Sequence, residues 1–154
     1  MIIGAALTPY EGNSLTGKLP WIGMSAAILV YLQSILGGLV GSSWALHQCF
    51  GNSQLCKVMN AHILGVVPPT LATIAVVWFT KKTPGLQQKL RFLANSAAAL
   101  VSLQILLGIA TFKLHLQVEP LTVTHQLVGA SLLGVLIAFT VLAIRDRNNQ
   151  QSSI

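Results

Sequence analysis

The sequence predicts an all-α integral membrane protein, a four-helix bundle built from two repeated helical hairpins. Of its 154 residues, 53% are hydrophobic and only 8% are charged, whereas a soluble domain has about 25% charged residues. Four charge-free apolar stretches each reach the roughly 20 residues that a helix needs to cross a bilayer. The net charge of +6 accompanies no nucleic-acid-binding pattern, so the lipid bilayer, not nucleic acid, is the expected surrounding.

Each apolar stretch is expected to be a helix, because an open strand edge finds no hydrogen-bond partner in lipid. The four spans cover approximately residues 21–46, 58–80, 92–112 and 121–144. Residues 1–20 then form an N-terminal arm, residues 21–144 the bundle and residues 145–154 a tail. The first apolar run, Met1 to Leu7, is short and has no basic flank, so we expect no cleaved signal peptide and a first span that stays as an anchor.

The basic residues between the spans predict the orientation. By the positive-inside rule, the arm, the loop between the second and third spans and the tail lie in the cytoplasm (or the stroma or matrix). The loops that carry Lys57 and Lys113 then lie on the outer side, which is periplasmic or lumenal. Both termini are therefore expected on the cytoplasmic side. The residues that decide this are Lys18, Lys81, Lys82, Lys89, Arg91, Arg145 and Arg147.

All four histidines fall on the predicted outer side. His47 and His115 lie at the interface, where solvation or a hydrogen bond explains them. His62 and His125 lie inside the second and fourth spans, at similar depth on helices that run in the same direction, where an ionisable group is costly and indicates function. Two such imidazoles suit a metal between them, and in a membrane bundle haem iron is the expected metal. An interhelical hydrogen bond is the structural alternative, and zinc is disfavoured because the cysteine and histidine spacings do not match a zinc site.

A weak internal duplication supports the pairing of His62 with His125. In each half, the outgoing helix carries a Gln-x-x-x-Gly segment and the returning helix carries a histidine, so a rotation about the membrane normal relates the two halves. That rotation brings the two histidines to equivalent positions on opposite sides of the bundle centre. A kink is expected at Pro68-Pro69. The repeated segments are Leu32 to Gly37 with Leu103 to Gly108, and Ala61 to Leu64 with Thr124 to Leu127.

The outer loops hold the remaining candidate residues. Cys49 and Cys56 stand in the first outer loop, and an even number of cysteines in an exterior loop predicts a disulfide. A redox-active pair is the alternative. Lys57 and Lys113 flank the outer face, and they are candidates either for pairing with haem propionates or for plain interfacial anchors.

These features together resemble one half of the heme A synthase family, whose members are typically built from two four-helix halves with histidines at the outer ends of the second and fourth helices. The resemblance spans about Val30 to Ile144. It departs from the family's catalytic half at Met59, where the family has a glutamate, at Ile63, where it has an arginine, and in the absence of a Trp-Pro from the cysteine loop. The matching features are Gly37-Gly38-Leu39-Val40 followed by cysteines seven positions apart, the Leu103 to Gly108 segment, His62 and His125.

The resemblance implies two functions. The first is a membrane subunit that binds haem b and serves assembly or cofactor delivery for a larger membrane complex. The second is a short heme A synthase that oxidises haem O to haem A as a homo-oligomer. Because Met59 replaces the glutamate implicated in that oxidation, the binding protein is favoured and enzymatic activity stays open. A transmembrane electron carrier is disfavoured because the inner half has no histidine, and a purely structural bundle leaves the histidine pair unexplained.

Overall fold

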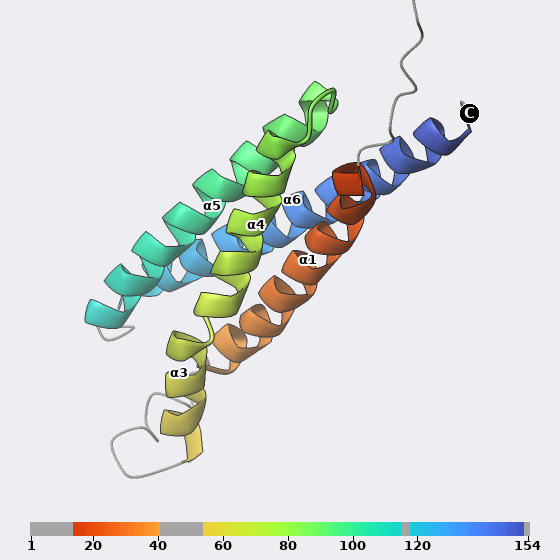
Figure 1. The fold of residues 1–154 in the computed structure, drawn as a ribbon. Helices are drawn as coiled ribbons and strands as arrows, with labels where there is room; N and C mark the ends of the chain where they lie inside the picture. Colours follow the sequence, from red (N-terminus) through yellow and green to blue (C-terminus); the bar gives the residue numbers. More distant parts are fainter. Residues whose placement is uncertain (1–13, 41–53, 115–117, 153–154) are drawn as a thin grey trace, which may run out of the picture.

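The computed structural model describes residues 14–40, 54–114 and 118–152, and this part of the chain forms an all-α bundle of four membrane-length helices (Figure 1). Helix α1 covers Ser14–Val40, and the second span consists of two segments, α3 (Gln54–Leu64) and α4 (Val67–Lys82). Helices α5 (Gln88–Lys113) and α6 (Glu119–Gln151) form the second hairpin. The predicted fold class is confirmed, since all four spans are long and apolar enough to cross a membrane.

The helices extend beyond the apolar stretches that predicted them. Helix α1 already begins at Ser14, before the expected start at Trp21, and it continues through the buried Pro20. Helix α6 continues past Ile144 to Gln151. The hydropathy of the sequence indicates where the chain leaves the hydrocarbon core, but not where the helical hydrogen bonds end. Polar turns at either end of a helix are therefore not predicted from hydropathy. Residues 41–46 of the expected first span lie outside the described residues.

The second span is broken and not merely kinked. Gly65 and Val66 separate α3 from α4, and Pro68 and Pro69 stand in the first turn of α4. A proline ring clashes with the carbonyl four residues earlier when the helix continues, whereas in a first turn its missing N–H leaves no bond broken. The break therefore precedes the two prolines, at the point where their rings would otherwise meet the end of α3.

The four spans form a closed ring in which every neighbour is antiparallel. Helix α1 packs against α6, α6 against α5, α5 against α4, and α4 against α1, with the most extensive packing along α6 (Figure 1). Helices on a diagonal of the ring, α1 with α5 and the α3–α4 span with α6, run in the same direction. The two histidine-bearing spans are thus diagonal partners across the bundle axis.

Tight packing is concentrated in one half of the bundle. We call the end where α1 begins, α4 meets α5 and α6 ends the basic end, and the opposite end the histidine end. The least exposed large side chains belong to the half nearer the basic end, while α3, among the described helices, packs closely on α1 alone. The histidine end is therefore the more open one. The five largest of these buried side chains are Phe139, Leu19, Leu90, Leu136 and Val76.

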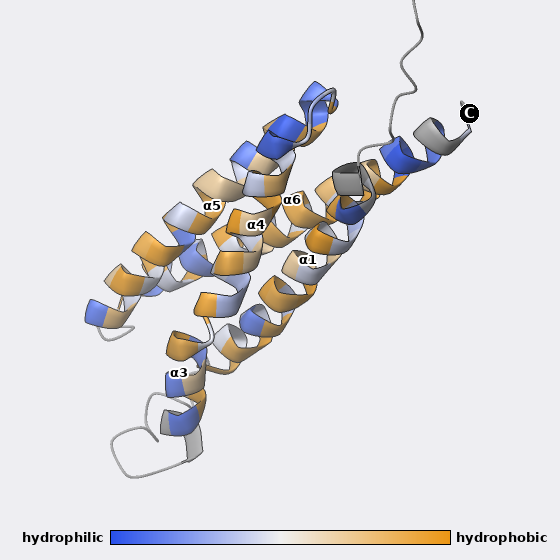
Figure 2. Cartoon of the chain, viewed as in Figure 1, coloured by the Kyte–Doolittle hydropathy of each residue, from blue (hydrophilic) through white to orange (hydrophobic). Residues whose placement is uncertain are grey.

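The outer surface of the bundle is apolar over most of its length. Hydrophilic residues gather near the two ends and hydrophobic ones between them (Figure 2). Large side chains face outward with high exposure, among them Phe92 at 69%, Leu127 at 65% and Trp78 at 60%. A soluble monomer does not expose such a continuous apolar surface. These side chains are suited to lipid, in agreement with an integral multi-pass membrane protein.

A short turn joins α4 to α5 at the basic end. Gly85 has a φ of 69°, a left-handed conformation that favours glycine. Arg91 Nη2 donates to the Thr83 carbonyl over 3.1 Å, and Gln87 Nε2 donates to the buried Asp146 carboxylate of α6 over 2.6 Å. The turn is thereby tied to the last helix, which fixes the basic end of the bundle.

Candidate functional site

His62 and His125 meet across the bundle axis near the histidine end. His62 stands five residues into the apolar span that begins at Lys57, and His125 stands six residues into the span that begins at Glu119. At 1.5 Å per residue, both lie about 8 Å along their helices from the span ends. Their ring centroids are 6.5 Å apart with an interplanar angle of 89°, and both side chains are half-buried. The structure thus brings together the two histidines that the sequence paired.

A glutamine from the neighbouring helix holds each imidazole. Gln33 Nε2 on α1 lies 3.0 Å from His62 Nδ1, and Gln104 Nε2 on α5 lies 3.2 Å from His125 Nε2. The two contacts are counterparts under the internal repeat, since each glutamine belongs to the outgoing helix of its own hairpin. The sequence identified these glutamines only as part of the repeat; the structure assigns them to orienting the rings.

The glycines of the repeat leave room for the same rings. A Cβ atom built at Gly37 lies 2.9 Å from His62 Cε1, and one built at Gly108 lies 3.2 Å from His125 Cε1. Two further glycines face the glutamines: a Cβ at Gly65 lies 2.7 Å from Gln33 Oε1, and one at Gly129 lies 3.0 Å from Gln104 Nε2. Each half of the bundle therefore repeats one local unit, in which two glycines accommodate an imidazole and its glutamine.

The break between α3 and α4 makes the two halves unequal. The last four carbonyls of a helix lack an intrahelical partner, and the His62 carbonyl near the end of α3 accepts a 2.6 Å hydrogen bond from Gln33 Nε2. Helix α6 continues through His125, so Gln104 bonds to the ring alone. Buried His125 Nδ1 and Gln104 Oε1 have no hydrogen-bond partner among the described residues. In the second half of the bundle, the imidazole and its glutamine therefore each keep one polar atom without a hydrogen-bond partner among the described residues.

The geometry of the pair fits two ligands on one metal. Two imidazoles joined to one metal through metal–nitrogen bonds of about 2 Å have ring centroids roughly 6 Å apart, close to the separation observed here. The ring nitrogens that no glutamine contacts are His62 Nε2 and His125 Nδ1, as judged over the described part of the chain. Because a glutamine N–H faces the other nitrogen of each ring, these two bind a metal once each amide turns to present its Oε1 instead. Within residues 14–40, 54–114 and 118–152, no three His, Cys, Asp or Glu side chains converge, so the residues that would hold a metal here are the two histidines.

The other candidate residues lie on α3 and at the end of α5, on the same side of the bundle as the pair. Lys57 on α3 and Lys113 at the end of α5 are exposed, and neither forms an ion pair with a described residue. Met59 is half-buried on α3, and Ile63 is 42% exposed.

The predicted disulfide and the two interfacial histidines are not tested by the structure. Cys49, His47 and His115 lie outside the described residues, and the side chain of Cys56 is not described either. The Cys49–Cys56 disulfide therefore remains a prediction from the sequence.

Comparison with known proteins leaves the site to be interpreted on its own geometry. No protein-family model matches the chain, and neither a curated protein nor a solved structure is significantly similar to it. The resemblance to the heme A synthase family therefore rests on the motifs in the sequence, and the function inferred from it is a proposal.

Proposed function

We propose that this chain is a haem-binding membrane protein, with His62 and His125 as the two axial ligands of one haem, most simply haem b. The observation that supports this most strongly is the separation of 6.5 Å between two imidazoles on diagonal helices. Haem held in this way supplies redox chemistry whose potential depends on the axial ligands and on the hydrogen bonds around them. The chain's own part is to hold both rings in place and to exclude water with its apolar spans.

The glutamines have a defined role in this proposal. A metal-ligating histidine usually has its other ring nitrogen fixed by a hydrogen bond, which sets the tautomer and the ring orientation. In the structure Gln33 presents its amide Nε2, a donor, to His62 Nδ1 at 3.0 Å, so ligation through Nε2 would require the Gln33 amide to turn and let Oε1 accept from Nδ1–H. At His125 the Gln104 amide Nε2 lies 3.2 Å from the ring Nε2 while Gln104 Oε1 has no partner among the described residues, so the same turn of the amide would let Oε1 accept from Nε2–H and leave Nδ1 for iron. At the histidine end α3 packs closely on α1 alone among the described helices and meets α6 through the His62–His125 pair, and the haem would lie there between the two spans.

Orientation and setting complete the proposal. The positive-inside rule places the basic end and both termini on the cytoplasmic side, and the haem near the outer face. Lys57 and Lys113 are at the outer ends of their helices, where they suit either propionate groups or interfacial anchoring. A subunit with one haem near one face serves assembly or cofactor delivery within a larger membrane complex or a homo-oligomer better than electron transfer across the membrane.

The binding function is favoured over heme A synthase activity by the residues near the pair. Oxidation of the haem methyl in that family implicates a carboxylate, and Met59 stands at its position on α3. Among the described residues, Glu119 is six positions before His125 at the start of α6, and Asp146 is at the opposite end of the bundle. Detection of haem O or haem A in the purified protein would restore the enzymatic alternative.

The test is the absorption spectrum of the detergent-purified protein, oxidised and reduced, with extraction and typing of the pigment. Low-spin haem b is expected in the wild type. The substitutions His62→Ala and His125→Ala should each abolish the low-spin spectrum, whereas the neighbouring exposed positions provide the controls Asn60→Ala and Gln126→Ala, which should keep it. A colourless wild type after incubation with haem, or low-spin haem retained in both histidine variants, contradicts the proposal.

The angle between the two rings gives a second readout. Because the ring planes are 89° apart, the two imidazoles interact with different iron d orbitals. The oxidised protein is therefore expected to give a strongly anisotropic low-spin electron paramagnetic resonance signal. A rhombic signal with three well-resolved g values, typical of parallel rings, would contradict the ring geometry while leaving haem binding itself intact.

A further inference from the structure

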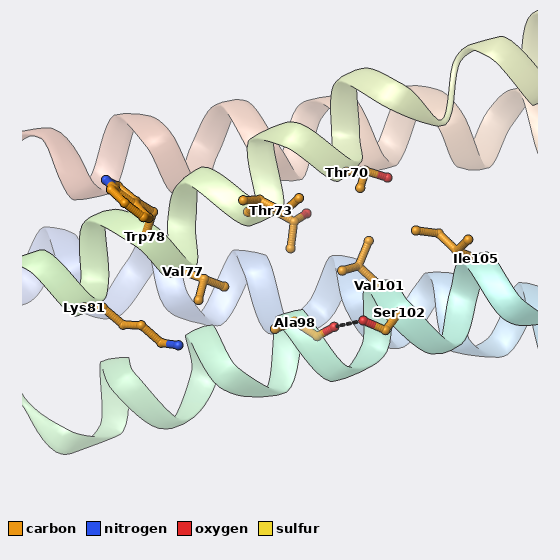
Figure 3. Close-up of a pocket in the computed structure, with 10 residues that line it drawn as sticks. Thr70, Thr73, Val77, Trp78, Lys81, Ala98, Val101, Ser102 and Ile105 are labelled. Carbon is orange, nitrogen blue, oxygen red and sulfur yellow. Dashed lines mark hydrogen bonds between the residues drawn. The ribbon is translucent and has the colours of Figure 1, made fainter.

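A groove of about 300 Å³ lies between α4 and α5 and runs from Lys81 at the basic end to beyond the middle of α5 (Figure 3). Ile74 and Val77 of α4 and Val101 and Ile105 of α5 contribute apolar walls. The groove contains none of the residues of the histidine site. It follows the seam between two antiparallel spans, so in a bilayer it opens toward lipid.

The hydroxyl groups in the groove are already satisfied. Thr70, Thr73 and Ser102 line it, and each hydroxyl donates to the backbone carbonyl four residues earlier, over 2.8 to 2.9 Å. Their protons are therefore not available to an occupant. The body of the groove thus suits a hydrocarbon chain and not a polar molecule.

A cation stands at the membrane-surface end of the groove. Lys81 extends from the last turn of α4 toward α5 (Figure 3), and it is exposed without an ion-pair partner in the described part of the chain. The two described carboxylates are elsewhere, since Asp146 accepts from Gln87 and Glu119 begins α6 at the opposite end. Within the described residues, therefore, no carboxylate is paired with Lys81, and its ammonium group is available to an anionic ligand.

The α4 wall of the groove is about as long as one leaflet of a bilayer, while the α5 wall continues past the middle of that helix to Ile105. From Lys81 to Thr70 the groove follows eleven residues of α4, about 17 Å at 1.5 Å per residue. Half of a hydrocarbon core of about 30 Å is roughly 15 Å. Trp78, which lines the groove one turn from its charged end, has Lys82 Nζ at 5.2 Å from its ring, an arrangement typical of the membrane interface.

We propose that this groove binds one phospholipid with an anionic headgroup from the leaflet at the basic end. One acyl chain lies between α4 and α5, and the phosphate pairs with Lys81. The charge at one end, the apolar body and the leaflet-length wall on α4 together favour this occupant. The site is independent of the histidine pair, so its success or failure is separate from that of haem binding.

The test uses the full chain in mild detergent, stripped of lipid and then titrated with phosphatidylglycerol, with native mass spectrometry to count the lipids retained. The wild type should retain one phosphatidylglycerol per chain. Ala98→Phe fills the groove and should weaken retention more than tenfold, whereas Ala99→Phe, the same change at the exposed neighbouring position, should not. Lys81→Gln should weaken it about fivefold, from roughly 1 kcal/mol per basic residue near an anionic lipid.

Several outcomes decide between the occupants. Lys89→Gln removes a charge at the same end outside the groove, so an equal loss for Lys81→Gln and Lys89→Gln overturns the site in favour of general attraction to anionic lipid. Equal retention by Ala98→Phe and Ala99→Phe overturns it as well. Competition by inorganic phosphate alone would show an anion site without a chain, and a change confined to the monomer–dimer ratio would show a second copy of the chain in the groove; either result refutes the proposal. Helix content by circular dichroism checks that each variant folds.

Discussion

Replacing Gly37 with alanine tests whether the glycines of the repeat exist to seat the imidazoles. The new Cβ would lie 2.9 Å from His62 Cε1, closer than real Cβ contacts allow, so the ring must move. Moving it breaks the 3.0 Å contact with Gln33. The adjacent Gly38→Ala variant is the matched control, because its Cβ meets nothing within 4 Å.

The expected magnitude follows from the difference between these two variants. Alanine is favoured over glycine in a helix by about 1 kcal/mol, and since both positions lie within α1, this gain cancels. What remains is the steric term at Gly37, about 1 to 3 kcal/mol for an extra methyl in a packed site. Its lower limit corresponds to a ring that rotates and gives up one hydrogen bond of about 1 kcal/mol. Gly37→Ala should therefore have an unfolding equilibrium constant roughly 5- to 150-fold larger than that of Gly38→Ala.

The assay is equilibrium unfolding of both variants in mixed detergent micelles, followed by circular dichroism. The absorption spectrum of any bound haem is recorded on the same samples, and Gly37→Ala should lose low-spin haem while Gly38→Ala keeps it. Equal stability of the two variants, together with equal haem content, would show that His62 does not occupy the position against Gly37, and it would refute the reasoning.

The remaining predictions concern the second half of the site and the packing of the bundle. Gly108→Ala brings a Cβ to 3.2 Å from His125 Cε1, so it should weaken haem retention less than Gly37→Ala does but more than Gly134→Ala, whose Cβ meets nothing within 4 Å; haem titration ranks the three. Gly23→Ala places a Cβ 2.9 Å from Cδ1 of the fully buried Phe139, so it should force α1 from α6 and cost about 1 to 3 kcal/mol in detergent unfolding, and a neutral result would contradict that packing. Gln87→Ala removes the 2.6 Å hydrogen bond to the Asp146 carboxylate and should cost about 1 to 2 kcal/mol, measured against Gln88→Ala at the exposed next position, where no such loss is expected.

The two glutamines illustrate what a sequence motif can predict and what requires the tertiary structure. The repeat of Gln33 and Gly37 in Gln104 and Gly108 is visible in the sequence, and it indicates that the two halves share a local structure. It does not say what the motif contacts, because interhelical neighbours depend on how each helix is rotated about its axis. That rotation is set by packing around the whole ring of helices.

At Gly65 and Val66, the two consecutive prolines correctly predicted where the second span is disturbed, but the disturbance is a break and not the expected kink. Two consecutive prolines predict a disturbed helix, and a kink within a continuous span was expected. The structure has a full interruption, and the freed His62 carbonyl bonds to Gln33 on another helix. A partner for that carbonyl is a tertiary contact, so no pattern within the second span alone could indicate it.

By itself, the sequence determined the all-α class, the positions of the four apolar spans and the equivalence of His62 with His125. These follow from the low number of charged residues, the length of the apolar spans and the internal repeat, all of which can be read from the linear sequence. Only the tertiary structure decided that the two rings meet at 6.5 Å, that glutamines hold them unequally, and that a groove opens between α4 and α5. Those features depend on which helices are neighbours and how they are rotated, and in lipid this is set by close packing of small residues and by interhelical hydrogen bonds, because apolar burial does not discriminate between faces there.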